Sequence, residues 1–572
     1  MKSKIKLLLS FLLAGVMIAP LSANSYVDGI EYFKAGQPER ARILLERTLN
    51  DPETKKAESY YYLGEIAFLN KDYAKAQEYY DKGVEADPMY GYNLIGQGKL
   101  LLNKQDIKGA EALFKEATKL DKKSSGYQLA IAKAYYRTGT PGYEKYLEKA
   151  RKQDKNNPDC FVFIGDMKAD AKDNGAASQN YEMAILKDSG CVEAYVKYSH
   201  VYFNINADEA IQKLELLLAK APTSALAQRE MAEAYYKKGQ YSKAVDAYER
   251  YIKNPNHFET DRPRLAALLY YDKRYDESLA LAAKILEKDP SNFVIHRVVM
   301  YDNFELKKYA EAEAAAELFF NGPSDENNVF IARDYLVYGD VFSAQKKYAE
   351  AASQYQKALD CDSTNVDIIK KLSDAYDRQN DYENAILYYK KYMEADAEKN
   401  QRTMNFYNLG QLHYSAGIAA ASEFQKLAGE NAKKLSDEAR AAKEKADAYL
   451  LYADTLFAIV AEKAPDDVRG YIWRARSAFG RDQDLKLGLA KPFYLQTLEI
   501  LDKDPANKEK KATRRYYTES YNYLANYYYQ KTTDLDAKVQ KDAVKNARLY
   551  WSKMLELDPN NKDIKEMLDT LK

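Results

Sequence analysis

Two consecutive stretches decide the fold of this chain: NVFIARDYLVYGDVFSAQKKYAEAASQYQKALDC (residues 328–361) and DSTNVDIIKKLSDAYDRQNDYENAILYYKKYMEA (residues 362–395). Large and small side chains recur between them after a step of 34 residues. The recurring residues are Tyr335, Tyr338, Gly339, Phe342, Ala351, Tyr355 and Ala358 in the first stretch and Ile369, Leu372, Ser373, Tyr376, Ala385, Tyr389 and Tyr392 in the second. A step of this length, with the order large–large–small–large in its first half, is typical of a helix–turn–helix repeat.

The spacing of these residues explains why each stretch forms two helices. When positions are counted from the start of a repeat, positions 4, 7, 8 and 11 lie one helical turn apart and share a face. Positions 20, 24 and 27 do the same on a second helix. Small residues at positions 8, 20 and 27 let the two backbones approach, and large residues fill the remaining space. Because one pair of helices cannot bury its own apolar face, neighbouring pairs have to stack.

The quoted residues resemble the tetratricopeptide repeat (TPR) family. Its pattern is a large residue, Leu-Gly and Tyr in the first helix, followed by Ala, an aromatic residue, Ala and Pro. Another copy near the start of the chain follows this pattern closely, with Tyr60, Leu63, Gly64, Ala67, Ala76, Tyr80, Gly83 and Pro88. The resemblance implies an all-α fold, an α-α superhelix (TPR solenoid) of about 14 helix–turn–helix repeats with a C-terminal capping helix.

The repeats are expected to fill nearly all of the chain. Repeats 1 to 11 are predicted in residues 24–400 and repeats 12 to 14 in residues 401–559, with a polar capping helix at 560–572. In repeat 12 an insertion near 417–445 is rich in Ala, Lys and Glu, which are strong helix formers. We therefore expect a lengthened helical hairpin there. Residues 321–327, which include a Gly-Pro pair, are the best candidate for a hinge.

Residues 1–23 have the pattern of a secretory signal peptide. Three lysines precede an apolar segment, 7–19, that is too short to span a membrane. Pro20 ends this segment, and cleavage is expected after Ala23. A lipoprotein signal would need a cysteine at the cleavage site, and the first cysteine is Cys160. The mature protein is therefore expected to be exported, and to be periplasmic or associated with the outer membrane.

Composition excludes some classes of partner. Lysine plus arginine and aspartate plus glutamate balance at 86 residues each, and removing the leader leaves 83 basic residues, a formal charge of −3. Because there is no basic excess, neither a nucleic-acid partner nor an anionic membrane surface is indicated. No later segment is apolar and long enough to span a bilayer. Tyrosine is unusually frequent, with 52 copies against 2 tryptophans.

Only three cysteines occur, so a disulfide framework is excluded. Cys160 and Cys191 lie at the starts of consecutive repeats. A bridge between them is compatible with an oxidising compartment, but two buried free thiols are the favoured interpretation.

Catalytic and metal-binding patterns are missing from the sequence. The four histidines, His200, His257, His296 and His413, are scattered, and no two have the spacing of metal ligands. No HExxH, GxSxG, CxxC or phosphate-loop pattern occurs. The sequence therefore predicts a protein that is not an enzyme, with no cofactor and no metal.

The family resemblance directs attention to the inner groove of the superhelix. In TPR proteins side chains at positions 2, 5, 9, 12 and 13 typically face this groove. Position 12 here is mostly aromatic, and large rigid rings make a good docking surface. The rings that we select as candidate partner-binding residues are Phe68, Tyr136, Phe203, Tyr236, Tyr270, Phe304, Tyr414, Phe479 and Tyr529, together with the basic groove residues Arg229, Arg297 and Lys370. The alternative is that these rings pack between neighbouring helices.

Three functions compete at this point. The first is a non-catalytic scaffold or adaptor that binds other proteins or peptides of the bacterial cell envelope through the groove and the repeat 12 hairpin. The second is a glycan- or cell-wall-binding accessory protein, because tyrosine faces can stack on sugars. The third is a hydrolase with an unrecognised site. The fold alone does not choose among them, since function depends on particular sites.

Overall fold

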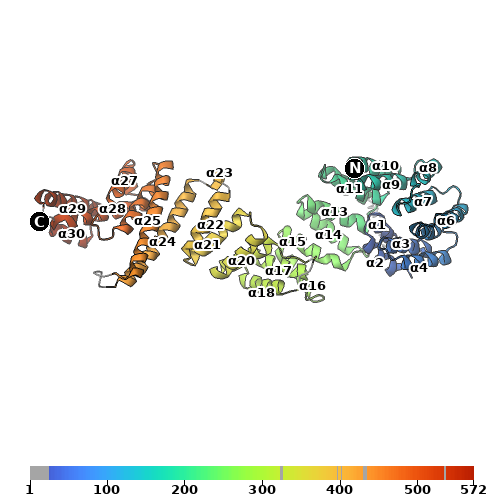
Figure 1. Ribbon diagram of the computed structural model, residues 1–572, viewed down its shortest axis with the longest axis horizontal. Coiled ribbons are helices and arrows are strands. Elements are labelled where there is room, and N and C mark those ends of the chain that lie inside the picture. Colours follow the sequence, from blue (N-terminus) through green and yellow to red (C-terminus); the bar gives the residue numbers. More distant parts are fainter. Residues whose placement is uncertain are drawn as a thin grey trace, which may run out of the picture. The chain divides into compact units, whose positions relative to one another are not determined.

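The computed structural model describes residues 25–571 apart from 323–325, 327, 396, 401, 430–434 and 534–535 (Figure 1). The predicted signal peptide lies outside the described residues, and so does most of the predicted hinge. The described residues form α-helices with three short 3-10 helices and contain no strand, which confirms the predicted all-α fold. The chain divides into two compact units, which meet between Asp302 and Asn303.

The first unit consists of eight helical hairpins and the start of a ninth. Its helices are α1 (Ser25–Lys34), α2 (Pro38–Thr48), α3 (Lys56–Leu69), α4 (Tyr73–Ala86), α5 (Tyr92–Asn103), α6 (Ile107–Leu120), α7 (Ser125–Arg137), α8 (Tyr143–Gln153), α9 (Pro158–Asp170), α10 (Asn174–Lys187), α11 (Val192–Tyr202), α12 (Ala207–Lys220), α13 (Ala225–Lys237), α14 (Tyr241–Lys253), the 3-10 helix η1 (Glu259–Asp261), α15 (Arg262–Tyr271) and α16 (Tyr275–Leu286).

The second unit completes the ninth hairpin and adds five more. Its helices are α17 (Phe293–Glu305), in which the division falls, α18 (Tyr309–Asn321), α19 (Ala332–Ala344), α20 (Tyr348–Cys361), α21 (Val366–Arg378), α22 (Tyr382–Ala395), the short α23 (Ala397–Asn400), α24 (Thr403–Ala428), α25 (Asp437–Lys463), α26 (Val468–Arg481), α27 (Lys491–Asp502), α28 (Lys511–Gln530), α29 (Ala537–Leu557) and α30 (Lys562–Asp569). Helix α30 follows the last hairpin and packs against α29.

The insertion in repeat 12 lengthens both helices of its hairpin. Helix α24 has 26 residues and α25 has 27, whereas most first and second helices have 10 to 14. The side chain of Ser436 accepts a hydrogen bond from the backbone N–H of Ala439 and so caps the start of α25. Gly417 lets the two helices approach, because a methyl group there would lie 2.6 Å from Cγ of Leu450.

Contact between a small residue at position 8 and a ring at position 24 holds the two helices of a hairpin together. A Cβ atom added at Gly64 would lie 2.3 Å from the Tyr80 ring, and one added at Gly165 would lie 2.5 Å from the Tyr181 ring. The rings of Tyr80 and Tyr181 are buried. The 16-residue spacing between the glycine and the tyrosine therefore places an aromatic ring of the second helix directly against a glycine of the first.

We expect Gly165→Ala to lower the free energy of unfolding by about 1–3 kcal/mol, because the buried Tyr181 ring has to move. Gly175→Ala in the same hairpin is the matched control. A Cβ at Gly175 would meet only the Asp173 carboxylate at 3.8 Å, so this change should leave stability unchanged or raise it by up to about 1 kcal/mol. Urea unfolding of both variants measures the difference, and equal effects would contradict this packing role.

The N-terminal unit closes on itself. We call helices α1 to α16 the N-terminal coil. Helix α1 contacts both α11 and α13, so the first hairpin lies against hairpins six and seven (Figure 1). One buried hydrophobic cluster joins Tyr32 and Leu45 to Tyr251 and Phe258, more than 200 residues away in sequence. The rings of Tyr32 and Phe258 meet edge to face with centroids 5.5 Å apart. The first helices therefore surround an enclosed inner face.

Candidate binding groove

Polar contacts reinforce the closure of the N-terminal coil. The guanidinium of Arg40 in α2 donates two hydrogen bonds to the carboxylate of Asp261, at 2.6 and 2.8 Å. The same carboxylate accepts hydrogen bonds from Tyr251 at 2.7 Å and from Arg229 at 3.2 Å. Asp261 is buried, and these donors satisfy the charge that burial would otherwise penalise. Asp261 is therefore the polar centre of the closure.

Further hydrogen bonds extend this contact along α1. Asp28 accepts hydrogen bonds from the side chain of Asn256 and from the backbone of Ala225. Glu31 accepts one from the hydroxyl of Ser224 at 2.6 Å. We define the closing contacts as these bonds together with the Arg40–Asp261 pair. They join two segments that the sequence separates by almost 200 residues or more.

The closing contacts include groups with opposite pH dependence. Burial raises the pKa of Asp28 to about 6 and that of Glu31 to about 7. Burial also opposes ionisation of Asp261, but hydrogen bonds from Arg40 and the charge of Arg229 outweigh it and lower the pKa of Asp261. The pKa values of Asp28 and Glu31 are higher in the folded protein than in the unfolded chain, so protonation of these two carboxyls favours the folded state. Asp28 and Glu31 therefore favour closure at acidic pH. Asp261 favours closure while it is ionised.

We therefore expect stability to pass through a maximum. As the pH falls from 8 to 5, protonation of Asp28 and Glu31 in the folded state should raise the melting temperature. Below about pH 4, the stabilisation from Asp261 should be lost as its carboxylate becomes protonated. Thermal unfolding across this range tests the expectation. An Asp28→Asn, Glu31→Gln double variant should lose the rise between pH 8 and 5 but keep the fall below it.

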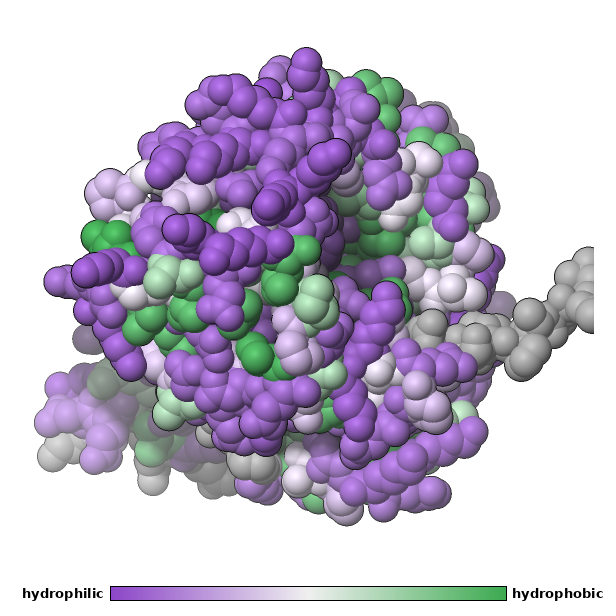
Figure 2. Space-filling model, turned by 90° about the vertical axis from the view of Figure 1, so that its right-hand side faces the viewer, coloured by the Kyte–Doolittle hydropathy of each residue, from purple (hydrophilic) through white to green (hydrophobic). Residues whose placement is uncertain are grey.

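A polar cavity of about 550 Å³ opens next to the closing contacts. Its wall combines groove-facing side chains from α11, α13 and α15 with the turn between α1 and α2. The lining residues are Gln37, His200, Arg229, Glu230, Glu233, Lys237, Tyr248, Asp261 and Arg264. Figure 2 views this end of the molecule, where hydrophilic side chains cover most of the surface and hydrophobic ones form scattered patches.

Most charges around the cavity are paired within the protein. Buried Glu230 accepts a hydrogen bond from Gln37 at 2.8 Å, and its other oxygen lies 2.7 Å from Nε2 of His200. Burial opposes ionisation of Glu230, but the hydrogen bond and charge of His200 outweigh it and lower the pKa of the carboxyl. Arg264 forms a two-pronged pair with Glu233 at 2.7 and 3.0 Å. Exposed Lys237 lies at the rim, with its ammonium 5.9 Å from the Phe203 ring.

The predicted aromatic row joins neighbouring repeats. Tyr136 at position 12 meets Phe163 of the next repeat edge to face, with centroids 5.5 Å apart. Tyr414 and Trp473 form the same pair at 5.1 Å. In these pairs, the second ring occupies position 6 of the following repeat. Among the described residues, such pairs include Phe33–Tyr62, Tyr136–Phe163, Tyr414–Trp473 and Phe479–Tyr523.

The other predicted rings have similar surroundings. Tyr236 lies 5.6 Å from Tyr271, and Tyr270 lies 5.5 Å from Tyr301, in each case a ring of the next repeat. The rings differ in solvent exposure: Phe68 and Tyr270 are buried, whereas the Phe479 residue is 38% exposed. The half-buried rings are Tyr136, Phe203, Tyr236, Phe304, Tyr414 and Tyr529. The row thus contributes to packing between repeats, while an edge of most rings remains accessible.

The charged groove positions also form joints between repeats. Asp166 at position 9 accepts hydrogen bonds from Tyr181 of its own hairpin and from Lys197 of the next. Asp340 accepts from Tyr355 and Lys371 in the same way. Both lysines lie at position 6, which is not among the positions that typically face the groove. These ion pairs follow a simple sequence pattern: an acidic residue at position 9 of one repeat and a basic residue at position 6 of the next. This pattern could have predicted the contacts between repeats.

The three basic residues chosen as groove candidates are not brought together. Arg229 lies in the polar cavity and contacts Asp261 and Glu230. Arg297 packs its guanidinium 5.0 Å from the Phe293 ring. Lys370, in the second unit, pairs with Asp374 one helical turn away. Of the three, only Arg229 lines the cavity.

Comparisons with known proteins identify the repeat. The sequence profile of the tetratricopeptide repeat matches residues 26–89, 202–257 and 339–400. A curated TPR repeat-containing protein of Methanocaldococcus jannaschii is 25% identical over 248 residues, which cover 41% of this chain and 43% of that protein. These matches identify tetratricopeptide repeats within this chain. The chain therefore matches less than half the length of this curated relative.

Solved structures similar to this TPR protein include the C-terminal part of a TPR repeat-containing protein from Cytophaga hutchinsonii. It is 25% identical, covers 53% of this chain and 98% of its own, and superposes with a TM-score of 0.35. A tetratricopeptide repeat protein from Parabacteroides merdae is 17% identical, covers 50% of this chain and 98% of its own, and has a TM-score of 0.28. The repeats are identified by the matches of the sequence profile and not by these superpositions.

Repeats of the TPR family commonly mediate protein–protein interactions and are typically non-catalytic, which points to protein partners for this chain. Among the described residues, no helix has both the length and the apolar character needed to cross a bilayer.

Proposed function

We propose that this TPR protein is an exported, non-catalytic scaffold of the bacterial cell envelope that binds an extended peptide segment of another protein. The polar cavity of about 550 Å³ on the inner face of the N-terminal coil carries this proposal. Its lining residues Lys237 and Arg264 lie 5.9 and 4.0 Å from the centroids of the half-buried rings of Phe203 and Tyr236. Its rim also holds His200. Rings and charges of both signs suit a peptide that has apolar and polar side chains.

A displayed library of unstructured peptides provides the direct test. Peptides selected on the mature protein should bind in calorimetry and should lose at least about tenfold in affinity in a His200→Ala, Lys237→Ala double variant. Both side chains are exposed, and Glu230 keeps its hydrogen bonds from Gln37 and Arg229 when His200 is removed. Lys243→Ala is the control, since Lys243 lines a separate cavity of about 370 Å³ between α12, α13 and α14. Binding that depends only on Lys243 would contradict an inner-face site.

Export is tested separately. The leader pattern in residues 1–23 supports processing, and the mature protein in an envelope fraction should begin at Asn24. Mass spectrometry of the protein purified from cells reads this terminus. An intact terminus in a cytoplasmic fraction would contradict the envelope location without affecting peptide binding.

A second candidate function, glycan binding, is favoured by a cluster of tyrosines on the inner face. Tyr61, Tyr62, Tyr90 and Tyr92 are all half-buried, and Tyr61 lies 5.1 to 6.5 Å from each of the other rings. The faces of tyrosine rings can stack on sugars. Calorimetry against a panel of cell-wall polysaccharides decides between the candidates, and binding that is lost in Tyr90→Ala would favour the glycan.

A further inference from the structure

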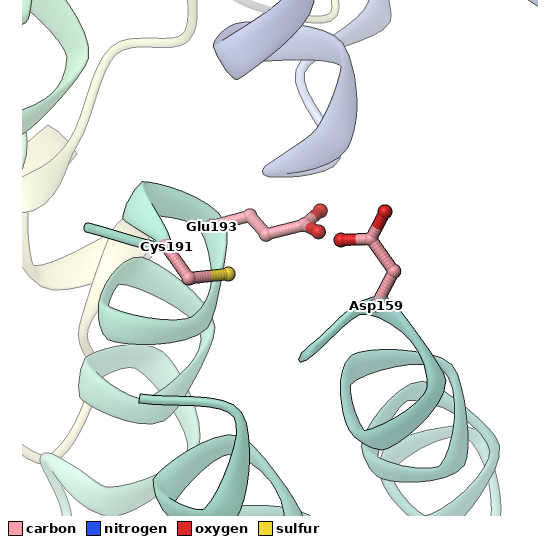
Figure 3. Close-up of side chains that lie close together, drawn as sticks. All are labelled: Asp159, Cys191 and Glu193. Carbon is pink, nitrogen blue, oxygen red and sulfur yellow. The ribbon is translucent and has the colours of Figure 1, made fainter. Parts of the chain in front are cut away.

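Three groups that can bind a metal converge on the inner face of the N-terminal coil. They are the carboxylates of Asp159 and Glu193 and the thiol of Cys191, and their ligand atoms all lie within 4.8 Å of one another. In Figure 3 the two carboxylates point toward each other, and the sulfur of Cys191 faces the same gap. Cys160 and Cys191 are both buried free thiols, which confirms the favoured interpretation of the sequence.

The repeat explains why these groups meet. Asp159 and Glu193 both occupy position 2, 34 residues apart, at the starts of α9 and α11. Position 2 faces the groove, so successive first helices bring the two carboxylates side by side. Cys191 is the residue immediately before α11 and lies two residues before Glu193. The two helices therefore supply three ligands from rigid positions.

Glu193 shows that the cluster is not satisfied by the protein alone. Its side chain is only 6% exposed, and its Oε1 atom accepts no hydrogen bond. A buried carboxylate oxygen without a donor costs free energy, which a bound cation would recover. Glu193 therefore points to a missing positive ligand.

Lys34 at the end of α1 is the cation nearest to this gap. Its ammonium lies 3.6 Å from Asp159 and 3.9 Å from Glu193, beyond the usual length of a hydrogen bond. The side chain is 34% exposed, so one side of it faces solvent. Lys34 therefore neutralises the two carboxylates only partly, and it would compete with any other cation that enters.

We propose that Asp159, Cys191 and Glu193 form a binding site for a thiophilic divalent cation of the Zn²⁺ class, which displaces the ammonium of Lys34. One thiolate and two carboxylates suit Zn²⁺ better than Ca²⁺ or Mg²⁺, which prefer oxygen ligands alone. Three protein ligands leave one tetrahedral position for water or for a group of a bound partner. The ligand atoms have to move closer by about 1 Å, since Zn–S and Zn–O bonds are about 2.0–2.3 Å long.

Binding must release a proton. Cys191 is a buried free cysteine, and a thiol has to lose its proton before its sulfur can bind a metal. The cation bonds to the sulfur as the S–H bond breaks, and the proton passes to solvent. Affinity should therefore rise with pH. Binding also detaches Lys34 from α9 and α11, which couples the site to closure of the coil.

Cobalt binding tests the proposal in a Cys160→Ser, Cys361→Ser protein, in which Cys191 is the only thiol. Co²⁺ alone should produce a thiolate-to-metal absorption band in the near ultraviolet, and Zn²⁺ alone should abolish it by competition. Cys191→Ser should remove the band, and Glu193→Gln should weaken binding at least about tenfold. Lys34→Met should strengthen binding several-fold, because the competing ammonium is gone.

Two results would overturn the proposal. One is that no band appears even in the Lys34→Met protein. The other is that Co²⁺ and Zn²⁺ bind equally well after Cys191→Ser and Glu193→Gln. Glu193→Gln keeps the shape of the side chain, so circular dichroism of this variant should match that of the parent protein and exclude loss of the fold as the cause.

Discussion

Replacing Asp261 with alanine is expected to lower the free energy of unfolding of the N-terminal coil by about 3–5 kcal/mol. The change leaves Arg40 and Arg229 without their shared carboxylate and leaves the hydroxyl of Tyr251 without its acceptor. Two guanidinium groups would then repel each other in a partly buried site. Urea unfolding measures the loss, and hydrogen exchange should show α1 and α2 opening first.

Glu259→Ala is the matched control for this prediction. Glu259 lies two residues from Asp261 and also pairs with an arginine, but its side chain is exposed. Exposed ion pairs contribute little, so this variant should unfold like the parent protein. If both variants behaved alike, or if exchange in α1 did not change in Asp261→Ala, the carboxylate would not be the centre of the closure.

The second large effect is expected at a joint between repeats 2 and 3. Lys99 is buried, and its ammonium lies 2.6 Å from Glu65 and 4.0 Å from the Phe68 ring. Glu65 also accepts a hydrogen bond from Tyr80 at 2.8 Å. Glu65→Ala would leave a buried ammonium and a buried hydroxyl unpaired, at a cost of about 3–5 kcal/mol. Thermal unfolding should show a correspondingly lower melting temperature.

Glu78→Ala provides the comparison, because Glu78 pairs with Lys75 and Lys82 on the exposed face of α4. Removing an exposed carboxylate should change stability little. A Glu65→Ala protein as stable as Glu78→Ala would mean that the charge at position 9 is a solvated groove residue, as the sequence alone allowed, and not part of a joint.

The hairpins themselves could be predicted from the sequence because each is determined locally. Gly64 and Tyr80 are 16 residues apart, and their contact follows from two helix periods and a short turn. The lengthened helices α24 and α25 follow from composition in the same way, since Ala, Lys and Glu favour helix wherever they occur. Local periodicity therefore fixed element type and pairing.

The closure of the coil could not be predicted in this way. Arg40 and Asp261 are 221 residues apart, and their meeting depends on small rotations that add up over seven repeats. The total rotation over seven repeats cannot be read from the sequence of any one repeat. The role of the aromatic row was ambiguous for a similar reason, since the ring that packs on Tyr136 is Phe163 of the next repeat. Whether such a ring faces solvent depends on the angle between repeats.

Carbodiimide cross-linking of the metal-free protein tests the closure most directly, because this reagent joins amines to carboxylates that are already in contact. Lys197 and Asp166, 2.8 Å apart in adjacent repeats, serve as the internal positive control. The closed coil predicts a second cross-link, between Lys34 and Asp159 or Glu193, which mass spectrometry of the digested monomer would identify. Recovery of the Lys197–Asp166 product alone would contradict closure.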